Sequence, residues 1–376
     1  MKHDMVARRE AAIEKLDGYV RTRLADALGC SGEEFTLSVA PEGTRSLVLF
    51  LEMPVGRFVV KCLDDIVRAT STVIATRHVV RRGGPVPRLV FADLSPITRM
   101  RLGWFVLVEE RVEGGSFYEG GRTDARLRAA ARALAQLHSV TRPRWGPLLP
   151  GLGRRSGYFR DIHARLTRRL DDLVGEMEGF EAIGRPEIRE WLGAQVASGE
   201  QAGGYSLSHL RVTQTNIMFP SDDEAVLIDL LTARYAHFAI DLERAVQRWC
   251  GLETARREIF LETYFGAFTA VTREQWEAVR PYHRASFHLT QAYRAAKELR
   301  KFFANGRIEK LRRRRRTLDR SLRRMLRTIA EAPDAPPQEI LQDTRRRVLA
   351  AARALRARIP DTKGTGSGDP DGTDQE

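Results

Sequence analysis

The stretch SHLRVTQTNIMFP, residues 208–220, and the stretch AVLID, residues 225–229, decide the fold of this chain. A polar loop leads into a short apolar segment, a polar turn follows, and a second apolar segment ends in an aspartate. This alternation predicts a β-hairpin within a part of the chain that otherwise has helical periodicity. We expect Asn216 and Asp229 to lie near the same end of that hairpin.

Asn216 and Asp229 are candidate ligands of a divalent cation. An amide oxygen and a carboxylate suit Mg²⁺, which proteins hold through one or two side chains while substrate phosphates and water complete its shell. A structural interpretation also fits, in which both side chains end their strands by bonding to nearby backbone groups. The hairpin alone does not choose between the two.

Toward the N-terminus the sequence predicts a small antiparallel sheet. Residues 1–28 have the apolar spacing of an amphipathic helix. Short β-favouring runs follow, separated by turns that contain proline and glycine, and a helical stretch at 65–82 interrupts them. The predicted strands are 35–39, 46–53, 57–63, 88–92 and 104–110.

Lys61 stands near the end of the third predicted strand, in the apolar run FVVKCL, residues 58–63. Lysine is depleted in strand interiors, and a lysine held among apolar neighbours needs an anionic partner. Lys61 is therefore a candidate phosphate-binding residue. At a solvated strand edge it would have no such role, and the residues alone leave both interpretations open.

Toward the C-terminus the pattern is mostly helical, from 125–138 onward to a last basic helix at 339–358. Residues 310–327 combine an apolar stripe with a dense arginine face. Such a face either binds an anionic partner, such as nucleic acid or lipid, or is a solvated surface enlarged by arginine-rich codon usage. Aromatic residues are few there, which disfavours a platform for single-stranded nucleic acid. The tail, residues 361–376, is expected to be disordered.

Composition narrows the class of protein. The chain of 376 residues has 43% hydrophobic residues and no apolar run near the ~20 residues of a spanning helix, so we expect a globular protein without a transmembrane segment. The first 29 residues lack the pattern of a secretory signal, which predicts a cytoplasmic location. Three widely spaced cysteines disfavour a zinc cluster or a disulfide scaffold. The net charge of +13 suits an anionic ligand.

The order of these features resembles the aminoglycoside phosphotransferase and choline kinase group of kinase-like folds. The features are a strand lysine, an alanine-rich helix ending in LAQLH (134–138), the His209 loop with Asn216, the strand ending in Asp229, and the later Asp241-Leu242. The resemblance covers roughly residues 35–327. It implies an α+β, bilobal protein-kinase-like fold with a small antiparallel-sheet N-lobe and a mainly helical C-lobe.

On this basis we expect five parts of the chain. They are an N-terminal amphipathic helix (1–34), the N-lobe (35–113), the helical C-lobe with the catalytic loop and the metal-loop hairpin (114–330), a basic C-terminal helix (331–360) and the disordered tail (361–376).

The resemblance also assigns roles to individual residues. Lys61 would bind the α- and β-phosphates of ATP. The backbone of the linker at 107–114, with Glu110 and Val112, would hold the adenine. Asn216 and Asp229 would bind Mg²⁺, and Asp241 would be structural. The catalytic-loop positions are those of His209 and Arg211.

Three departures from the family pattern bear on activity. The catalytic aspartate of the family is replaced by Arg211, and an arginine stays protonated and cannot act as a base. The helical stretch 66–82 has no acid to pair with Lys61, although Asp64 and Asp65 lie close in sequence. The phosphate-covering loop, 40–45, has one glycine.

Three functions follow from these observations. The first is ATP- and Mg²⁺-dependent phosphoryl transfer to a hydroxyl of a small molecule, with Arg211 favouring an anionic substrate. The second is a catalytically impaired pseudokinase that serves as a nucleotide sensor, scaffold or regulatory partner. The third is an anion- or nucleic-acid-binding module that uses the arginine-rich helix.

Overall fold

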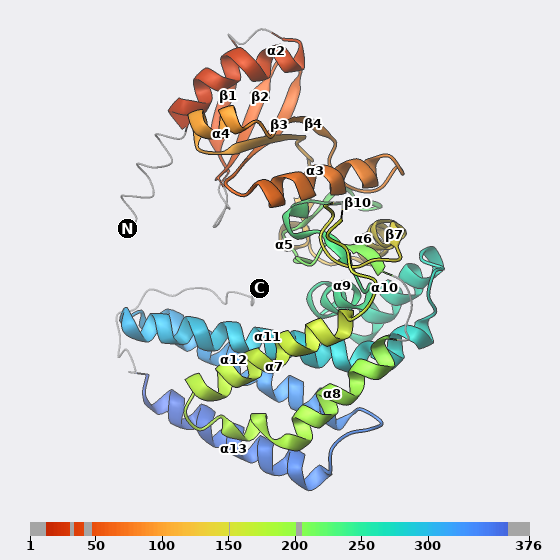
Figure 1. Cartoon of the computed structure of the whole chain (residues 1–376), viewed down its shortest axis with the longest axis vertical. Coiled ribbons are helices and arrows are strands. Elements are labelled where there is room, and N and C mark those ends of the chain that lie inside the picture. Colours follow the sequence, from red (N-terminus) through yellow and green to blue (C-terminus); the bar gives the residue numbers. More distant parts are fainter. Residues whose placement is uncertain (1–12, 31–33, 41–46, 150, 201–204, 360–376) are drawn as a thin grey trace. The chain divides into compact units, whose positions relative to one another are not determined.

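The structure is a computed structural model and describes residues 13–30, 34–40, 47–149, 151–200 and 205–359 (Figure 1). The phosphate-covering loop and the tail predicted from the sequence therefore lie outside the described residues, apart from Ala40. The chain forms two compact units, Met1–Arg155 with Gly204–Ala270, and Ser156–Gly203 with Val271–Glu376. The two units differ from the five parts predicted from the sequence, which were separated by secondary-structure type. The boundaries of those five parts stay predictions.

The first unit begins with a five-stranded antiparallel sheet, as the sequence predicts. Each observed strand lies within one or two residues of its predicted position. In spatial order the strands are β1 (Thr36–Val39), β2 (Leu47–Met53), β3 (Gly56–Leu63), β5 (Phe105–Glu110) and β4 (Leu89–Asp93).

Both faces of this sheet are covered by helix. Residues 13–28 are helical, with a π-helical turn at Val20–Leu24, and they bury Leu16 and Leu24 against one face. Helix α3 (Ile66–Val80) covers the other face. Because side chains alternate along a strand, Val60 and Cys62 of β3 face the N-terminal helix, and Lys61 faces the side of α3.

A short helix between β4 and β5 was not predicted. Helix α4 spans Pro96–Leu102, and Ser95 caps it by accepting a hydrogen bond from the backbone N–H of Ile97. The Ser-Pro pair at 95–96 is the sequence signal for this helix start, since serine caps a helix and proline suits its first turn.

The rest of the first unit surrounds the predicted hairpin. Strands β9 (Ile217–Ser221) and β10 (Glu224–Leu227) form that hairpin, and β6 (Gly115–Ser116) extends it. A second small sheet lies beside it, built from β11 (Arg234–Ala236), β8 (Tyr205–Ser208) and β7 (Thr141–Arg142). The accompanying helices are α5 (Phe117–Gly120), α6 (Asp124–His138), α9 (Ala239–Ala245) and α10 (Thr254–Ala267).

The second unit is helical. It contains α7 (Tyr158–Glu176), α8 (Pro186–Glu200), α11 (Arg273–Ala304), α12 (Ile308–Ala330) and α13 (Gln338–Ala357) (Figure 1). Helices α11 and α12 are separated at Gly306, whose φ of 63° ends one helix before α12 begins, and the sequence analysis did not predict this break. The predicted apolar stripe of α12 is buried, including Leu318 and Leu322. Among the described residues, no helix is long and apolar enough to cross a membrane.

Asp93, at the end of β4, ties the N-terminal helix to the sheet. Its carboxylate accepts hydrogen bonds from Tyr19 (2.7 Å) and Thr98 (2.8 Å) and forms an ion pair with Arg23 at 3.1 Å. Burial by itself raises the pKa of Asp93, but the hydrogen bonds from Tyr19, Ser95 and Thr98 outweigh burial and hold that pKa below its usual value.

We expect Asp93→Ala to lower the free energy of unfolding by about 2–4 kcal/mol, because several buried donors lose their acceptor. Asp93→Asn, which keeps one acceptor oxygen, should cost less. Since the pKa of Asp93 is lower in the folded state, its contribution should be complete above the ordinary aspartate pKa near ~3.9 and lost as the pH falls below it. Urea unfolding of wild type and Asp93→Ala at several pH values measures this difference. If the free energy of unfolding changed with pH equally in both proteins, the assignment would be contradicted.

Candidate functional site

Lys61 forms a buried ion pair with Glu109 of the neighbouring strand. The lysine Nζ lies 2.6 Å from the Glu109 Oε2, and the side chains are 8% and 5% exposed. Antiparallel pairing places Lys61 opposite Leu107, so Glu109 is its diagonal neighbour on the same face of the sheet. The strand lysine therefore has the anionic partner that its apolar surroundings require.

Glu109 is the partner of Lys61 that sequence reasoning missed. The acid was sought in the helix after Lys61, and α3 indeed has none, while Asp65 caps α3 by accepting hydrogen bonds from its first backbone N–H groups. The signal for Glu109 lies in the run FVLVEE, residues 105–110, where alternation puts Phe105, Leu107 and Glu109 on one face. Only the strand register identifies that face as the one that Lys61 shares.

The open end of the β9–β10 hairpin holds Asn216 and Asp229. The backbone N–H of Ile228 donates to the carbonyl of Asn216 at 3.1 Å, which joins the two chain segments directly beside both side chains. Asp229 has φ 64° and ψ 56°, in the left-handed region that aspartate tolerates better than most residues. The structure thus brings the two predicted metal ligands together.

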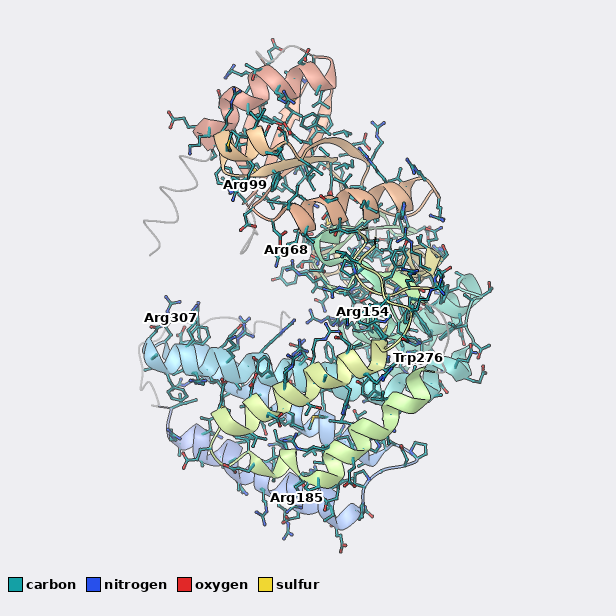
Figure 2. All side chains as sticks on the ribbon, in the orientation of Figure 1. Arg68, Arg99, Arg154, Arg185, Trp276 and Arg307 are labelled. Atoms are coloured by element: carbon teal, nitrogen blue, oxygen red, sulfur yellow. The ribbon has the colours of Figure 1, made fainter. Side chains whose placement is uncertain are left out.

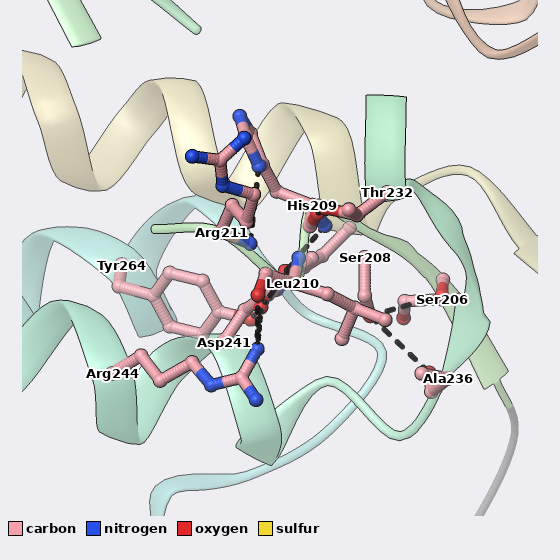
Figure 3. Close-up of polar contacts among 11 residues, drawn as sticks. Ser206, Ser208, His209, Leu210, Arg211, Thr232, Ala236, Asp241, Arg244 and Tyr264 are labelled. Carbon is pink, nitrogen blue, oxygen red and sulfur yellow. Dashed lines mark hydrogen bonds and ion pairs between the residues drawn. The ribbon is translucent and has the colours of Figure 1, made fainter. Parts of the chain in front are cut away.

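The loop before Asn216 is held by Asp241, a fully buried residue of α9 (Figure 3). Its carboxylate accepts hydrogen bonds from the backbone N–H groups of His209 and Leu210, and Arg244 donates to the Leu210 carbonyl. These bonds keep Leu210 at φ 62°, a conformation that costs a non-glycine residue about 1–2 kcal/mol. Burial raises the pKa of Asp241, but His138 and Arg244 beside it lower that pKa below its usual value.

Both ring nitrogens of His209 are engaged, and its side chain is fully buried. Nε2 lies 2.7 Å from the carbonyl oxygen of Ile228 and donates to it, so Nδ1 is the acceptor for the backbone N–H of Arg211 at 3.3 Å. A ring bonded in this way has no free nitrogen for proton transfer. His209 thus links the loop to the segment before Asp229, and its catalytic role stays a prediction.

Arg211 reaches across the site to the second predicted metal ligand. Its Nη1 lies 2.8 Å from the Asp229 Oδ2, and the two side chains are 44% and 21% exposed. The backbone of Arg211 is fixed as well, since the Asn216 amide donates to its carbonyl oxygen at 2.8 Å. The arginine that the sequence analysis placed at the catalytic-loop position thus forms an ion pair with one of the candidate metal ligands.

The remaining oxygen atoms of the hairpin end fit a divalent cation. In the described part of the chain, neither the Asn216 Oδ1 nor the Asp229 Oδ1 has a hydrogen-bond partner. The described residues contain no cluster of three or more histidine, cysteine, aspartate or glutamate side chains that could bind a metal by itself. Two oxygen ligands of this kind suit Mg²⁺ only when phosphates and water complete its shell.

Lys61 and Asp229 border the same apolar cluster. Leu63 and Leu107 pack with residues of α3, and Leu231, two residues after Asp229, packs against them. A backbone hydrogen bond of 2.7 Å from Leu227 to the carbonyl of Pro85 also fastens the hairpin to the segment after α3. The strand lysine and the hairpin end are therefore built around a shared core within the first unit.

The predicted adenine-holding linker, residues 107–114, begins within β5 and runs four residues past its end. The Glu110 side chain pairs with Arg88, with Nε 2.9 Å from Oε1, and its backbone N–H donates to the Arg88 carbonyl. The half-buried Val112 lies two residues after Glu110, and among the described residues its backbone N–H has no partner. A free donor at this point is what a purine ring would need, and the role of both residues remains a prediction.

The arginine face on α12 borders a groove shared with α13. The groove encloses about 260 Å³ and is lined by three arginines (323, 327 and 345), two glutamines (338 and 342) and three aliphatic residues, with no acid among them. Arginine side chains are numerous in this unit. One of them, Arg185, is labelled in Figure 2 and forms an ion pair with Asp343 of α13. An anionic partner for this face stays a prediction.

Sheet, hairpin and buried loop together define a protein-kinase-like fold of the aminoglycoside phosphotransferase type. The sequence model of the phosphotransferase enzyme family matches residues 36–282, and the chain belongs to that family. A search of curated protein sequences finds no significant match.

Solved structures of this fold are similar over most of the chain. A choline/ethanolamine kinase family protein from Mesorhizobium loti is 14% identical with a TM-score of 0.57, covering 91% of this chain and 99% of that one. The macrolide 2'-phosphotransferase MphH from Brachybacterium faecium is 15% identical with a TM-score of 0.53, covering 81% and 98%. A thermostable aminoglycoside phosphotransferase mutant, solved with ADP and hygromycin B, is 13% identical with a TM-score of 0.52, covering 81% and 98%.

We expect Asp241→Asn to lower the free energy of unfolding by about 2–4 kcal/mol, because two buried backbone N–H groups lose a charged acceptor. Asp319→Asn, which breaks an exposed ion pair with Arg323 on α12, is the control and should change stability by less than about 1 kcal/mol. Chemical denaturation of both variants gives the comparison. Equal small losses would show that the loop does not depend on Asp241.

Proposed function

We propose that this protein binds ATP with Mg²⁺ and transfers the terminal phosphoryl group to a hydroxyl of a small molecule. The observation that carries the proposal is the joint placement of Lys61, Asn216 and Asp229 around one core within a member of the phosphotransferase family. A relative of the same fold was solved with ADP, which supports a nucleotide as the ligand. The cytoplasmic location predicted from the sequence remains a prediction.

The roles follow from charge and position. Lys61, oriented by Glu109, would contact the α- and β-phosphates, and the backbone at Glu110 and Val112 would hold the adenine. Asn216 and Asp229 would hold Mg²⁺, which would supply positive charge against the phosphates. The guanidinium of Arg211 adds a positive charge at the reacting end, which favours an acceptor that is itself anionic.

Transfer without a carboxylate base is chemically consistent. The acceptor oxygen forms a bond to the γ-phosphorus while the bond from that phosphorus to the bridging oxygen breaks and ADP leaves. Arg211 cannot take the hydroxyl proton, so the proton passes to an oxygen of the transferred phosphoryl group. Because such transition states are loose, positioning and charge neutralisation supply most of the rate.

A second candidate function is favoured by the ion pair between Arg211 and Asp229. Arg211 cannot act as a general base, and its ion pair occupies one oxygen of a candidate metal ligand, Asp229. This arrangement is expected of a pseudokinase that binds nucleotide without transferring phosphate. The two candidates share nucleotide binding and differ in turnover, so binding and transfer must be measured separately.

Nucleotide binding is tested by thermal unfolding with ATP, with and without Mg²⁺. We expect a stabilisation of about 2.7 kcal/mol at a ligand concentration 100 times the dissociation constant. Lys61→Met alone would leave Glu109 buried and unpaired and cost about 3–5 kcal/mol, so the useful variant is Lys61→Met combined with Glu109→Gln. This double variant should fold and lose the nucleotide shift. A full shift in it would remove Lys61 from the site.

Phosphoryl transfer is tested by mass spectrometry of products from a panel of hydroxyl compounds, half of them carrying a carboxylate or phosphate. We expect a product that is 80 Da heavier, with anionic acceptors preferred, and none with Asp229→Ala. If ATP binds but no acceptor gains a phosphoryl group, the pseudokinase function replaces the transferase. Turnover that is unchanged in Asp229→Ala would instead contradict the metal assignment.

A further inference from the structure

We infer that Arg211 is a tethered cation that shares Asp229 with the divalent metal, so that the site accepts nucleotide in both metal-free and metal-bound form. The inference rests on the proposed function for nucleotide binding itself. What it adds is a regulation of the same site: the guanidinium reduces the dependence of nucleotide affinity on Mg²⁺.

The position of Arg211 is built into the fold. Its backbone N–H donates to His209 and its carbonyl accepts from Asn216, so the residue is fixed from both sides. The loop that carries it is held by the buried carboxylate of Asp241. The guanidinium alone extends toward solvent, where it meets Asp229 with 44% of the side chain exposed. The guanidinium can therefore move away from the Asp229 carboxylate while the backbone of Arg211 stays in place.

Charge decides how the site responds to each form of the nucleotide. Metal-free ATP is a tetra-anion, and an unpaired carboxylate at Asp229 would repel it, whereas a carboxylate already neutralised by Arg211 does not. Mg²⁺, in contrast, must compete with the guanidinium for the same oxygen atoms. Both effects act in one direction, since the arginine assists metal-free binding and weakens the gain that the metal brings.

The measurement is calorimetric titration of the full chain with the non-hydrolysable analogue AMP-PNP, in EDTA and in excess Mg²⁺. The ratio of the two dissociation constants is the coupling between nucleotide and metal. We expect the dissociation constant in EDTA divided by that in Mg²⁺ to be small in wild type and to rise about fivefold in Arg211→Ala, which corresponds to the loss of one partly exposed charge interaction. Arg211→Lys, which keeps the charge, should stay near the wild-type ratio.

The matched control is Arg323→Ala. Arg323 and Asp319 on α12 form an ion pair of the same length, 2.8 Å, with side-chain exposures of 46% and 21%, close to those of the Arg211 pair. Its loss removes one positive charge from a similar pair outside the site and should leave the ratio unchanged. Arg211→Gln serves as a second neutral variant if Arg211→Ala does not fold.

The outcomes separate the two proposals. A ratio in Arg211→Ala equal to that of wild type, with nucleotide bound in both, overturns the inference and leaves the proposed function standing. Wild-type binding that already depends strongly on Mg²⁺ overturns it as well. If no variant binds AMP-PNP under either condition, the proposed nucleotide site is wrong and the inference fails with it.

Discussion

The carboxylate of Asp241 is the constraint on which the rest of the site depends. It is fully buried and accepts the backbone N–H groups of two successive residues, His209 and Leu210. Those bonds hold Leu210 in a left-handed conformation that it would otherwise avoid, and the resulting turn sends Arg211 toward Asp229. The positive charge of Arg211 is therefore placed by a buried negative charge, that of Asp241.

A buried carboxylate needs compensation, and the surroundings supply it. His138 lies 3.7 Å from Asp241, and the other ring nitrogen of His138 bonds the hydroxyl of Tyr264 at 2.6 Å. Arg244, on the same helix as Asp241, supplies a positive charge beside the carboxylate. The network spans α6, α9 and α10. Polar contacts between these three helices therefore hold the carboxylate that fixes the loop. Such a network specifies one loop conformation because each member leaves another unpaired if it moves.

The sequence predicted the elements better than the contacts between side chains. Alternation and turn residues located all five strands of the sheet and both strands of the hairpin, because periodicity is a local property. The helix at Pro96–Leu102 was missed although its Ser-Pro start was visible. The break at Gly306 was missed because a helix can tolerate a single glycine, and basic helical stretches lie on both sides of this one.

The partners of the site residues could not be read in the same way. Glu109 is separated from Lys61 by 48 positions, and only the register of β3 against β5 makes them neighbours. Arg211 and Asp229 are 18 positions apart, and their contact depends on the φ angle of Leu210, which no pattern in the sequence encodes. Residue types therefore nominated the candidate site residues, while the fold decided which of their charges pair.

Burial distinguishes the two ion pairs of the site. Lys61 and Glu109 are each less than a tenth exposed, so separating them would leave a charge in a place that water does not reach. Arg211 is nearly half exposed, and an ion pair of that kind is worth little in water, about 1 kcal/mol or less. A ligand that brings its own charges into the site will therefore meet Lys61 and Glu109 as a fixed unit. The guanidinium of Arg211 is the charge that can change partner at small cost, which makes it the adjustable group of the site.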